Sequence, residues 1–545
     1  MHCTQSNSYI SLLPNEILRE IFKYFIPVSP EDNFRLTLSQ ICGHWRAIAC
    51  GLQQLWTYPD FQTPELAKEM LKRLGGAPLH IQFIHAEHTR KTHRMLPSDL
   101  IISRTELLYQ TFRQASHLET VNLDMPSSLM QELAARHVHT APALRSLYLF
   151  SDGCDLSPDF MGGNAPLLTR LVLDGCGLAY NSPLLHNLTS LDLTGSQHET
   201  SFARRLCEAL RFMPMLECLD LDEVYCDDPE DSVIAELPKL RRIGLHCTDL
   251  SGATIFNHIS FPTTTFVQVE VSYPEPPEDV SVDDIEFVWS GIGRMLSPRY
   301  FPGGERIIKA LAVDGDVEYE GLSFTLKAWD TIPPFDSIID DRGHLPIPNL
   351  HITVDWSERD RESPTFFEWL FKAAIRAFKR LPVLEILRLG AFPRYSENLS
   401  NLLIEALEPH LWSTPVHTLI FHVEHAAADL AEMLVYQPDN KPLPLSKLET
   451  LVFTYFDFDH QLVEGLYKSL RTRMRQGMKL KKNVVRASEN DSGSNMDLFE
   501  RVVEELDWDF DYTAGEDEDE ESDEDGDQEE SNNTKTNSES TESDP

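Results

Sequence analysis

A short leucine pattern that recurs along the chain is the feature that most restricts its fold. The spacing Leu-x-x-Leu-x-Leu occurs six times, and successive copies start 26, 24, 20, 28 and 24 residues apart. A period of roughly 20 to 50 residues indicates stacked structural repeats. The six copies are Leu118-Val121-Leu123, Leu144-Leu147-Leu149, Leu168-Leu171-Leu173, Leu188-Leu191-Leu193, Leu216-Leu219-Leu221 and Leu240-Ile243-Leu245.

Later copies of the pattern are more widely spaced. Three of them start 32 residues apart, at Leu384-Leu387-Leu389, Val416-Leu419-Phe421 and Leu448-Leu451-Phe453. Between about 251 and 380 the pattern is weak, and Pro274, Pro276 and Pro277 indicate a loop. The candidate strands of that region are Ile308-Leu311-Val313 and Leu350-Ile352-Val354.

The alternation within each copy predicts a strand whose apolar side chains share one face. Each repeat can bury that face only by stacking on its neighbours, and the segments between strands should return as helices. Residues 202–210 and 366–381 have helical character. We therefore expect an irregular leucine-rich-repeat-like α/β solenoid over residues 61–486. A mixed α/β domain with several similar strands is the alternative.

Strand residues that alternate with the leucines should line the concave face of such a solenoid. Acidic residues outnumber basic ones there, which favours a basic partner segment. The alternative is that these charges only solvate the sheet. The candidate substrate-binding residues are Tyr148, Arg170, Asp192, Asp220 and Arg242.

Two helices are expected ahead of the repeats. In the first, Ile17, Leu18, Ile21, Phe22 and Phe25 fall on one helical face. Proline suits its first turn and another proline stops it soon afterwards. A second helix is expected over Leu38, Ile41, Cys42, Trp45, Ile48 and Ala49, ending near Gly51. Helices this short bury little alone, so some of their apolar surface should be available to another protein.

Residues 8–60 resemble an F-box, a motif that docks the Skp-type adaptor of cullin ubiquitin ligases. The insert between the helices, residues 28–33, is longer than in the family pattern. The matching residues are Leu13-Pro14, Glu16-Ile17, Ile21-Phe22, Ile41-Cys42, Trp45, Ile48 and Leu55-Trp56. The resemblance implies that the adaptor binds through Leu13, Pro14, Ile17, Ile21, Ile41 and Trp45.

The resemblance also implies a function. The chain would be a non-catalytic subunit, present in one copy, that binds a Skp-type adaptor and through it a cullin, while the repeats hold a protein substrate. Three alternatives stay open: an F-box protein that acts without ubiquitylation, a solenoid scaffold whose first helices are only a cap, and, more remotely, an enzyme. No cofactor is expected.

Charge is concentrated at the C-terminal end. The chain has 47 basic and 87 acidic residues, a net charge of −40, and residues 487–545 hold 24 acidic and 2 basic residues. We expect this segment to be a disordered acidic tail. The overall acidity argues against nucleic-acid binding. No apolar run is long enough to span a membrane, and nine scattered cysteines without a CxxC pair favour a reducing compartment, cytoplasmic or nuclear.

Other candidate sites are weaker. His85, His88 and His93, and separately His422 and His425, could be read as metal ligands, but no cysteines accompany them. Gly291 and Gly293 lack the third glycine of a phosphate-binding loop. The basic cluster Arg471, Arg473, Arg475, Lys479, Lys481 and Lys482 fits a last helix and strand, a nuclear-localisation signal, or a docking site for the acidic tail. Ser522 precedes three acidic residues, as in sites of acid-directed kinases.

Overall fold

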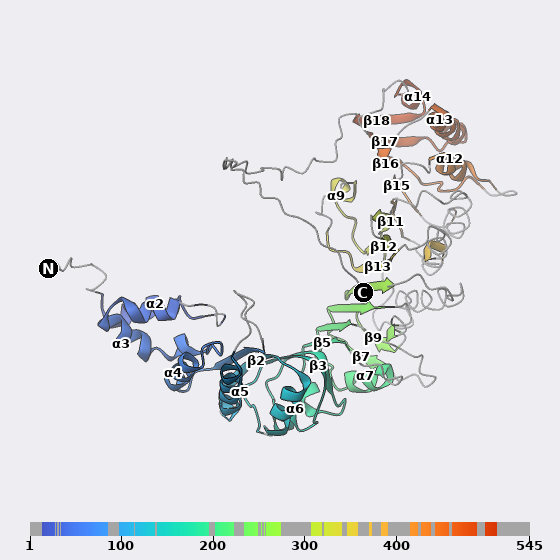
Figure 1. Cartoon of the computed structure of the whole chain (residues 1–545). Coiled ribbons are helices and arrows are strands. Elements are labelled where there is room, and N and C mark those ends of the chain that lie inside the picture. Colours follow the sequence, from blue (N-terminus) through green and yellow to red (C-terminus); the bar gives the residue numbers. More distant parts are fainter. Residues whose placement is uncertain are drawn as a thin grey trace, which may run out of the picture.

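The computed structural model shows an N-terminal group of helices followed by a long, curved sheet (Figure 1). It describes residues 13–27, 29, 32, 34–85, 97–113, 115–136, 139–195, 202–222, 234–248, 252, 255–256, 258–273, 307–318, 321–339, 346–357, 370–372, 383–390, 412, 415–422, 427–437, 442–456, 460–487 and 496–509. Among these residues, no helix has both the length and the apolar character needed to cross a membrane.

The N-terminal helices pack around their own apolar cluster. Their core includes Leu18, Phe22, Leu38, Leu55 and Trp56. The elements are α1 (Asn15–Lys23), α2 (Phe34–Ile41), α3 (Gly43–Gly51), the 3-10 helix η2 (Gln53–Trp56) and α4 (Pro64–Leu74).

The single second helix expected from the sequence is divided in two. Cys42 has an extended backbone, with φ −157° and ψ 169°. Its Sγ accepts a hydrogen bond from the backbone N–H of Trp45 at 3.4 Å, so it caps the N-terminus of α3. Apolar periodicity continues through this cap, which is why the sequence pattern alone did not reveal the break.

Sixteen strands of the described residues form one sheet, and most neighbours are parallel. In spatial order they are β1 (Leu79–Ile84), β2 (Leu118–Asp124), β3 (Ser146–Leu156), β4 (Arg170–Leu178), β5 (Ser190–Thr194), β6 (Cys218–Asp222), β8 (Arg242–Cys247), β10 (Phe266–Tyr273), β13 (Leu350–Ser357), β12 (Gly321–Trp329), β11 (Ala310–Glu318), β14 (Ile386–Leu389), β15 (Thr418–Phe421), β16 (Thr450–Phe456), β17 (Leu480–Ala487) and β18 (Val503–Asp509). A second, two-stranded sheet pairs β7 (Ala235–Glu236) with β9 (Ile259–Ser260).

The strand register places the leucines of successive repeats side by side. Leu147 pairs with Leu171, which pairs with Leu191, and the row continues through Leu219 to Ile243. These side chains are buried in the main apolar cluster. They all point to the side of the sheet that the helices cover, because side chains alternate between the two faces along a strand.

Helices cover the outer side of the arc that the strands follow in Figure 1. Helix α7 has the bounds expected from the sequence, whereas the helix expected over 366–381 falls largely outside the described residues. The longer helices are α5 (Ser98–Phe112), α6 (Ser127–Arg136), α7 (Phe202–Leu210), α12 (Ala427–Val435) and α13 (His460–Arg475). Short helical turns are η3 (Ala115–His117), η4 (Phe160–Gly163), η5 (Pro183–Leu185), α9 (Phe335–Ile339) and α14 (Met496–Glu500).

Strand order reverses in the region where the leucine pattern is weak. Strand β12 is antiparallel to both of its neighbours, β11 and β13. Two segments named from the sequence do form strands here, with Leu311 in β11 and Ile352 in β13. Strand β12 was not predicted. It carries the alternating apolar residues Phe324, Leu326 and Ala328 but lacks the leucine spacing of the other strands.

The ordered sheet continues past the expected boundary at residue 486. Helix α14 and strand β18 lie within the segment expected to be a disordered tail, and β18 pairs in parallel with β17. Phe499, Val502 and Val503 are buried. That expectation is therefore wrong for residues 496–509, where a few apolar residues among many acidic ones complete the sheet. Residues 510–545 lie outside the described part.

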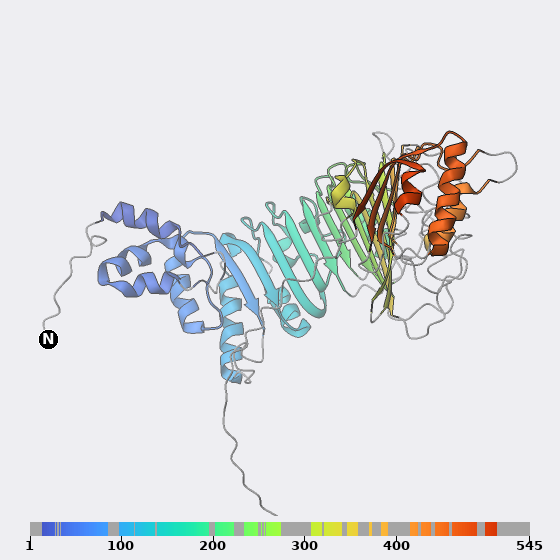
Figure 2. The ribbon, with the colours of Figure 1, turned by 90° about the horizontal axis from the view of Figure 1, so that it is seen from above.

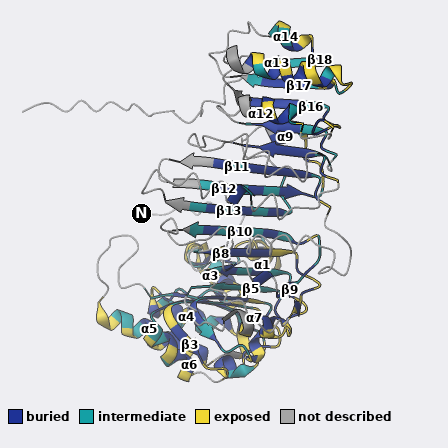
Figure 3. Cartoon of the chain, turned by 90° about the vertical axis from the view of Figure 1, so that its right-hand side faces the viewer, coloured by how far each residue is buried: buried dark blue, intermediate teal, exposed yellow. Residues whose placement is uncertain are grey.

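A second apolar cluster lies on the inner side of the arc. It joins residues of β11, β12, β14, β15, β16 and β17 to Ile338 of α9. Figure 1 shows α9 on that side, opposite α12 and α13, and Figure 2 shows the strands from above. In Figure 3 the strands of this half are largely buried. Among the described residues, α9 thus covers the inner face in its second half.

Candidate functional site

Large apolar side chains are exposed most densely on α1, on α2 and just beyond the end of α1. Six of the fifteen such residues of the described chain fall between positions 17 and 41. A gathering of exposed apolar side chains on a soluble protein indicates a contact surface. The six are Ile17 (47% exposed), Ile21 (37%), Tyr24 (89%), Phe25 (37%), Phe34 (61%) and Ile41 (54%), and we call them the exposed helical face.

The apolar residues of helix α1 differ in burial across one broad face. Leu18 and Phe22, four residues apart, point into the cluster and are buried. Ile17 and Ile21, also four residues apart, face outward. The apolar face expected from the sequence is therefore a single arc of α1, of which the fold buries one edge and leaves the other exposed. Periodicity identified the apolar residues, but it could not say which side would meet the rest of the fold.

Aromatic contacts organise both sides of the helical unit. Phe22 meets Trp45 edge to face, with ring centroids 5.1 Å apart. Phe25 lies beside Phe34, with centroids 5.9 Å apart. This second contact joins the end of α1 to the start of α2 on the exposed helical face.

The six residues expected to bind an adaptor divide by exposure. Ile17, Ile21, Ile41 and Pro14 are exposed, whereas Leu13 and Trp45 are half-buried. Both half-buried side chains pack against the apolar cluster of the N-terminal helices. The binding role of all six stays a prediction.

Sequence reasoning missed Tyr24 and Phe34 as contact residues. Both are aromatic residues at helix ends that contribute nothing to the buried cluster. Large aromatic residues outside the amphipathic pattern were the available signal.

Helix α4 joins the helical unit to the sheet. Met70 belongs to the cluster of the helices, while Ala67 and Leu74 belong to the main cluster of the sheet. The Arg73 guanidinium lies 4.7 Å from the centroid of the Trp56 ring. One helix thus contributes to both cores, which opposes independent movement of the two parts.

A buried arginine strengthens the same junction. Arg104 of α5 donates from Nε to the carbonyl of Phe61 at 3.1 Å and from Nη2 to the carbonyl of Ile84 at 2.8 Å. Burial lowers the pKa of its guanidinium, and Asp60 partly offsets that effect. At the start of β1, the backbone N–H of His80 donates to the carbonyl of Thr57 at 2.9 Å.

The five candidate residues of the concave face occupy the inner face of β3 to β8. Tyr148, Asp192 and Asp220 lie in one row, which runs through Val172. Arg170 and Arg242 lie in the adjacent row, two residues back along their strands. The Arg170 guanidinium is 5.4 Å from the Tyr148 ring centroid, and Arg242 Nη2 is 3.4 Å from Asp220 Oδ1.

Carboxylates accumulate at the centre of this face. Asp192 and Asp220 are paired positions on neighbouring strands. Burial, together with the nearby Asp220, raises the pKa of the Asp192 carboxyl. Asp222, two residues after Asp220, meets His246 at 3.0 Å between Oδ1 and Nδ1.

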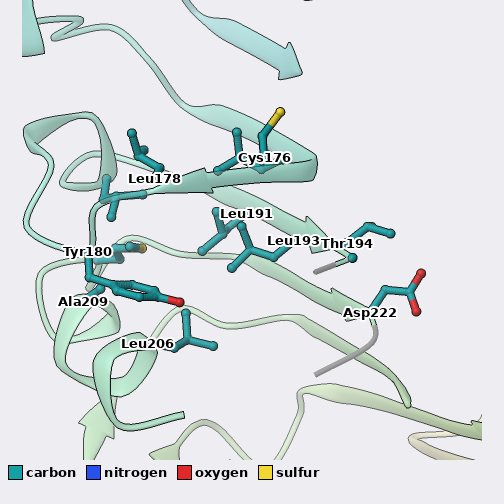
Figure 4. Close-up of a pocket in the computed structure, with 13 residues that line it drawn as sticks. Cys176, Leu178, Tyr180, Leu191, Leu193, Thr194, Leu206, Ala209 and Asp222 are labelled. Carbon is teal, nitrogen blue, oxygen red and sulfur yellow. The ribbon is translucent and has the colours of Figure 1, made fainter. Parts of the chain in front are cut away.

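A small cavity lies beneath the sheet, between β4, β5 and α7 (Figure 4). Its volume is about 30 Å³, and leucine is the commonest residue in its walls. Such a space holds about one water molecule. Figure 4 shows Thr194 and Asp222 at one end of the group of lining residues. A cavity of about 30 Å³ has no room for a cofactor.

No group of three or more potential metal ligands occurs among the described residues. His88, His93 and His425 lie outside them, as do Gly291, Gly293 and Ser522. His422 instead lies 2.7 Å from the Thr454 hydroxyl, measured from Nδ1.

Half of the basic cluster near residue 475, Arg473, Lys481 and Lys482, is engaged within the fold, whereas Arg471, Arg475 and Lys479 are exposed. Arg473 is fully buried, and its guanidinium donates to the carbonyls of Leu434, Pro444 and Leu445 at 3.1, 2.7 and 2.7 Å. Lys482 pairs with Glu505 at 2.9 Å and with Asp507 at 3.3 Å. The cluster therefore belongs to a last helix and strand, α13 and β17, which is the first of the three interpretations given from the sequence.

The family model described as F-box-like matches residues 10–62. No curated protein matches the chain. The matched span contains the exposed helical face and ends just before α4. The chain therefore combines an F-box-like helical domain with a large, mostly parallel α/β sheet.

Proposed function

We propose that this chain is the substrate-recognition adaptor subunit of a Skp–cullin–F-box ubiquitin ligase. The observation that carries the proposal is the exposed helical face inside the F-box-like domain. F-box domains typically bind Skp1-type adaptors, and a docking surface needs apolar anchors that the free protein leaves exposed. The residues expected to anchor the adaptor are Ile17, Ile21 and Ile41, which are the exposed isoleucines of this face.

The sheet is best interpreted as an irregular leucine-rich-repeat-like solenoid that presents the substrate. Its parallel strands align one leucine row after another, and such solenoids bind partners on extended concave surfaces. Residues Tyr148, Arg170, Asp192, Asp220 and Arg242 would contact the substrate protein. The junction through α4 and Arg104 would hold substrate and adaptor at a fixed separation.

In this role the chain supplies no catalytic group. Tethering the substrate raises its effective concentration at the ubiquitin-carrying enzyme, and proximity alone accelerates the transfer. The complex would contain one copy of the chain and assemble in the cytoplasm or nucleus, without nucleic acid or membrane.

A second candidate is a scaffold that binds the adaptor, or another protein, without ubiquitylation. It is favoured by the fact that the same exposed helical face and sheet would serve any assembly built from protein contacts.

Co-elution of the purified full chain with a Skp-type adaptor and a cullin in size-exclusion chromatography tests the proposal. The proposal predicts one species containing all three proteins. Elution with the adaptor but without the cullin would favour the scaffold. Failure to bind the adaptor would overturn the proposed function.

A further inference from the structure

The inner face of the sheet is divided into two unequal halves. From β11 to β17 it carries the apolar residues Ala312, Ile386, Ile420, Val452 and Val484, all buried. Ile338 of α9 belongs to the same cluster, and Phe335 packs against it. From β3 to β8 the corresponding row is mixed: Val172 and Gly244 are buried, whereas Tyr148, Asp192 and Asp220 are half-exposed.

An arginine fixes α9 on the second half. Arg388 of β14 is buried, and its Nη1 donates to the carbonyl of Ile338 at 2.9 Å. Its Nε lies 3.4 Å from Asp314 Oδ1 on the neighbouring strand β11. Gly390 leaves the space that this carboxylate fills, because a Cβ there would lie 1.8 Å from Asp314 Oδ1. The second half is therefore closed by the chain itself.

The first half has an excess of negative charge. Between β4 and β10, the inner face presents Asp174, Asp192, Asp220, Asp222 and Glu270 against two arginines, Arg170 and Arg242. Successive strands of a sheet are about 4.8 Å apart, so these carboxylates lie within reach of a single bound segment. Such a face is complementary to a positively charged partner.

Among the carboxylates of this face, Asp192 is the one best placed to meet a cation of a partner. Asp220 leans toward β8, where Gly244 leaves room: a Cβ at Gly244 would lie 2.4 Å from Asp220 Oδ1. There Asp220 meets Arg242, and Asp222 meets His246. Asp192 accepts a hydroxyl hydrogen bond from Thr194 at 3.5 Å and forms no ion pair within 4.0 Å among the described residues, although the charge of Arg170 on β4 acts on it from farther away.

The surroundings of Asp192 suit the stem of a long cationic side chain. Val172 is its paired neighbour on β4, and Tyr148 follows in the same row on β3. Lysine and arginine side chains pack their methylene groups on apolar surface while the charged end stays on a polar group. Burial and the neighbouring Asp220 raise the pKa of Asp192, and the charge of a cation beside it would oppose that rise.

We propose that the inner face of β3 to β8 binds an extended, lysine- or arginine-bearing segment of a partner protein, with one cationic side chain on Asp192 between Tyr148 and Asp220. This inference rests on the proposed function, because it names the chemical class of the substrate segment. The closed half beneath α9 limits the site to the strands nearer the helical domain.

The test uses the full-length chain and a labelled nine-residue peptide in which arginine alternates with serine, carrying a photo-crosslinking residue at its centre. Fluorescence anisotropy at physiological salt measures its affinity, and mass spectrometry locates the crosslink. We expect crosslinks on β3 to β8. The double variant Asp192→Asn, Asp220→Asn should bind about tenfold more weakly.

The matched control removes the same two charges elsewhere. Asp159→Asn, Glu236→Gln changes exposed carboxylates away from the inner face and should bind within about twofold of wild type. Equal affinities of the two double variants, or crosslinks confined to residues 510–545, would overturn the proposal. So would equally tight binding of a peptide with glutamate in place of arginine.

Adaptor capture by the same preparations separates this inference from the proposed function. Peptide binding at Asp192 without adaptor capture would leave the basic-segment site standing and reject the ligase role. Adaptor capture by a chain that fails the peptide test would do the reverse.

Discussion

Asn483 occupies a position where the neighbouring strands carry leucine. It pairs with Leu451 on β16 and Leu506 on β18, and its side chain is fully buried. Neither Nδ2 nor Oδ1 has a hydrogen-bond partner in the described part of the chain. A buried amide without partners keeps its full desolvation cost.

We predict that Asn483→Leu stabilises the protein. Removing the buried amide should raise the free energy of unfolding by about 1 to 2 kcal/mol, measured by urea denaturation. Leu451→Asn, the matched change on the adjacent strand, should lower it by a similar or larger amount. A destabilised Asn483→Leu variant would show that the amide has a partner outside the described residues.

His80 makes stability depend on pH at the junction. Its ring stacks on Tyr58, with centroids 4.4 Å apart. Burial lowers the pKa of His80 below its usual 6.5, and Glu119 offsets this in part. Below pH 6.5 the unfolded chain therefore binds a proton that the folded chain refuses, so the stabilisation present above that pH is lost on acidification.

We predict that His80→Phe weakens this pH dependence. The variant keeps a ring beside Tyr58 but cannot titrate. Its free energy of unfolding should fall less than that of wild type between about pH 7 and about pH 5, a range that includes the usual histidine pKa. Parallel pH profiles for the two proteins would exclude His80 as the cause.

At the scale of elements, the junction depends on a few groups that reach across it. Arg104 connects α5 to the loop at Phe61 and to the end of β1. No pattern in the sequence marked this residue, because a buried arginine is recognised only by the carbonyls around it. Leucine spacing, in contrast, predicted most strands, since each strand position that faces the helices requires an apolar side chain.

We predict that Arg104→Met loosens the junction. Two buried carbonyls would lose their donor, at a cost of about 2 to 4 kcal/mol in the free energy of unfolding. Hydrogen exchange should accelerate in α4 and β1. Arg113→Met, an exposed change at the end of the same helix, is the control, and equal exchange in both variants would contradict a role for Arg104.

The sequence predicted features that depend on local, periodic signals and missed those that depend on distant contacts. It indicated the F-box-like helices and the leucine strands, whose signals are local and periodic. Strand β12 and helix α9 were missed because their positions depend on partners distant in the chain. On the candidate site, the sequence named Ile17, Ile21 and Ile41, yet it grouped Ile17 and Ile21 with Leu18 and Phe22, which the fold buries.

At the scale of the whole molecule, the sheet of the described structure has two edge strands, β1 beside the helical unit and β18 at the other end. Strand β18 buries Val503 and pairs its carboxylates with Lys482 and Arg486 of β17. Negative charge thus has two roles here: acidic residues up to 509 complete the fold, whereas those beyond it lie outside the described sheet.

We predict that truncation distinguishes these two roles. A chain ending after Asp509 should unfold at the same temperature as the full chain. A chain ending after Ala487 loses β18 and exposes the edge of β17, so its melting temperature should fall by several degrees. Equal melting temperatures for both truncations, measured by calorimetry, would contradict a structural role for β18.

The most direct test of the central claim is the affinity of the full chain for a Skp-type adaptor, measured by isothermal titration calorimetry. The triple variant Ile17→Ala, Ile21→Ala, Ile41→Ala removes anchors of the exposed helical face. Ile102→Ala, Ile332→Ala, Ile347→Ala removes three other exposed isoleucines, which lie outside the helical unit. Truncated anchors typically cost a few kcal/mol in total, so the first variant should bind at least a hundredfold more weakly than wild type and the second should match it. Equal affinities for the two variants, or no binding by wild type, would contradict the assignment of this face.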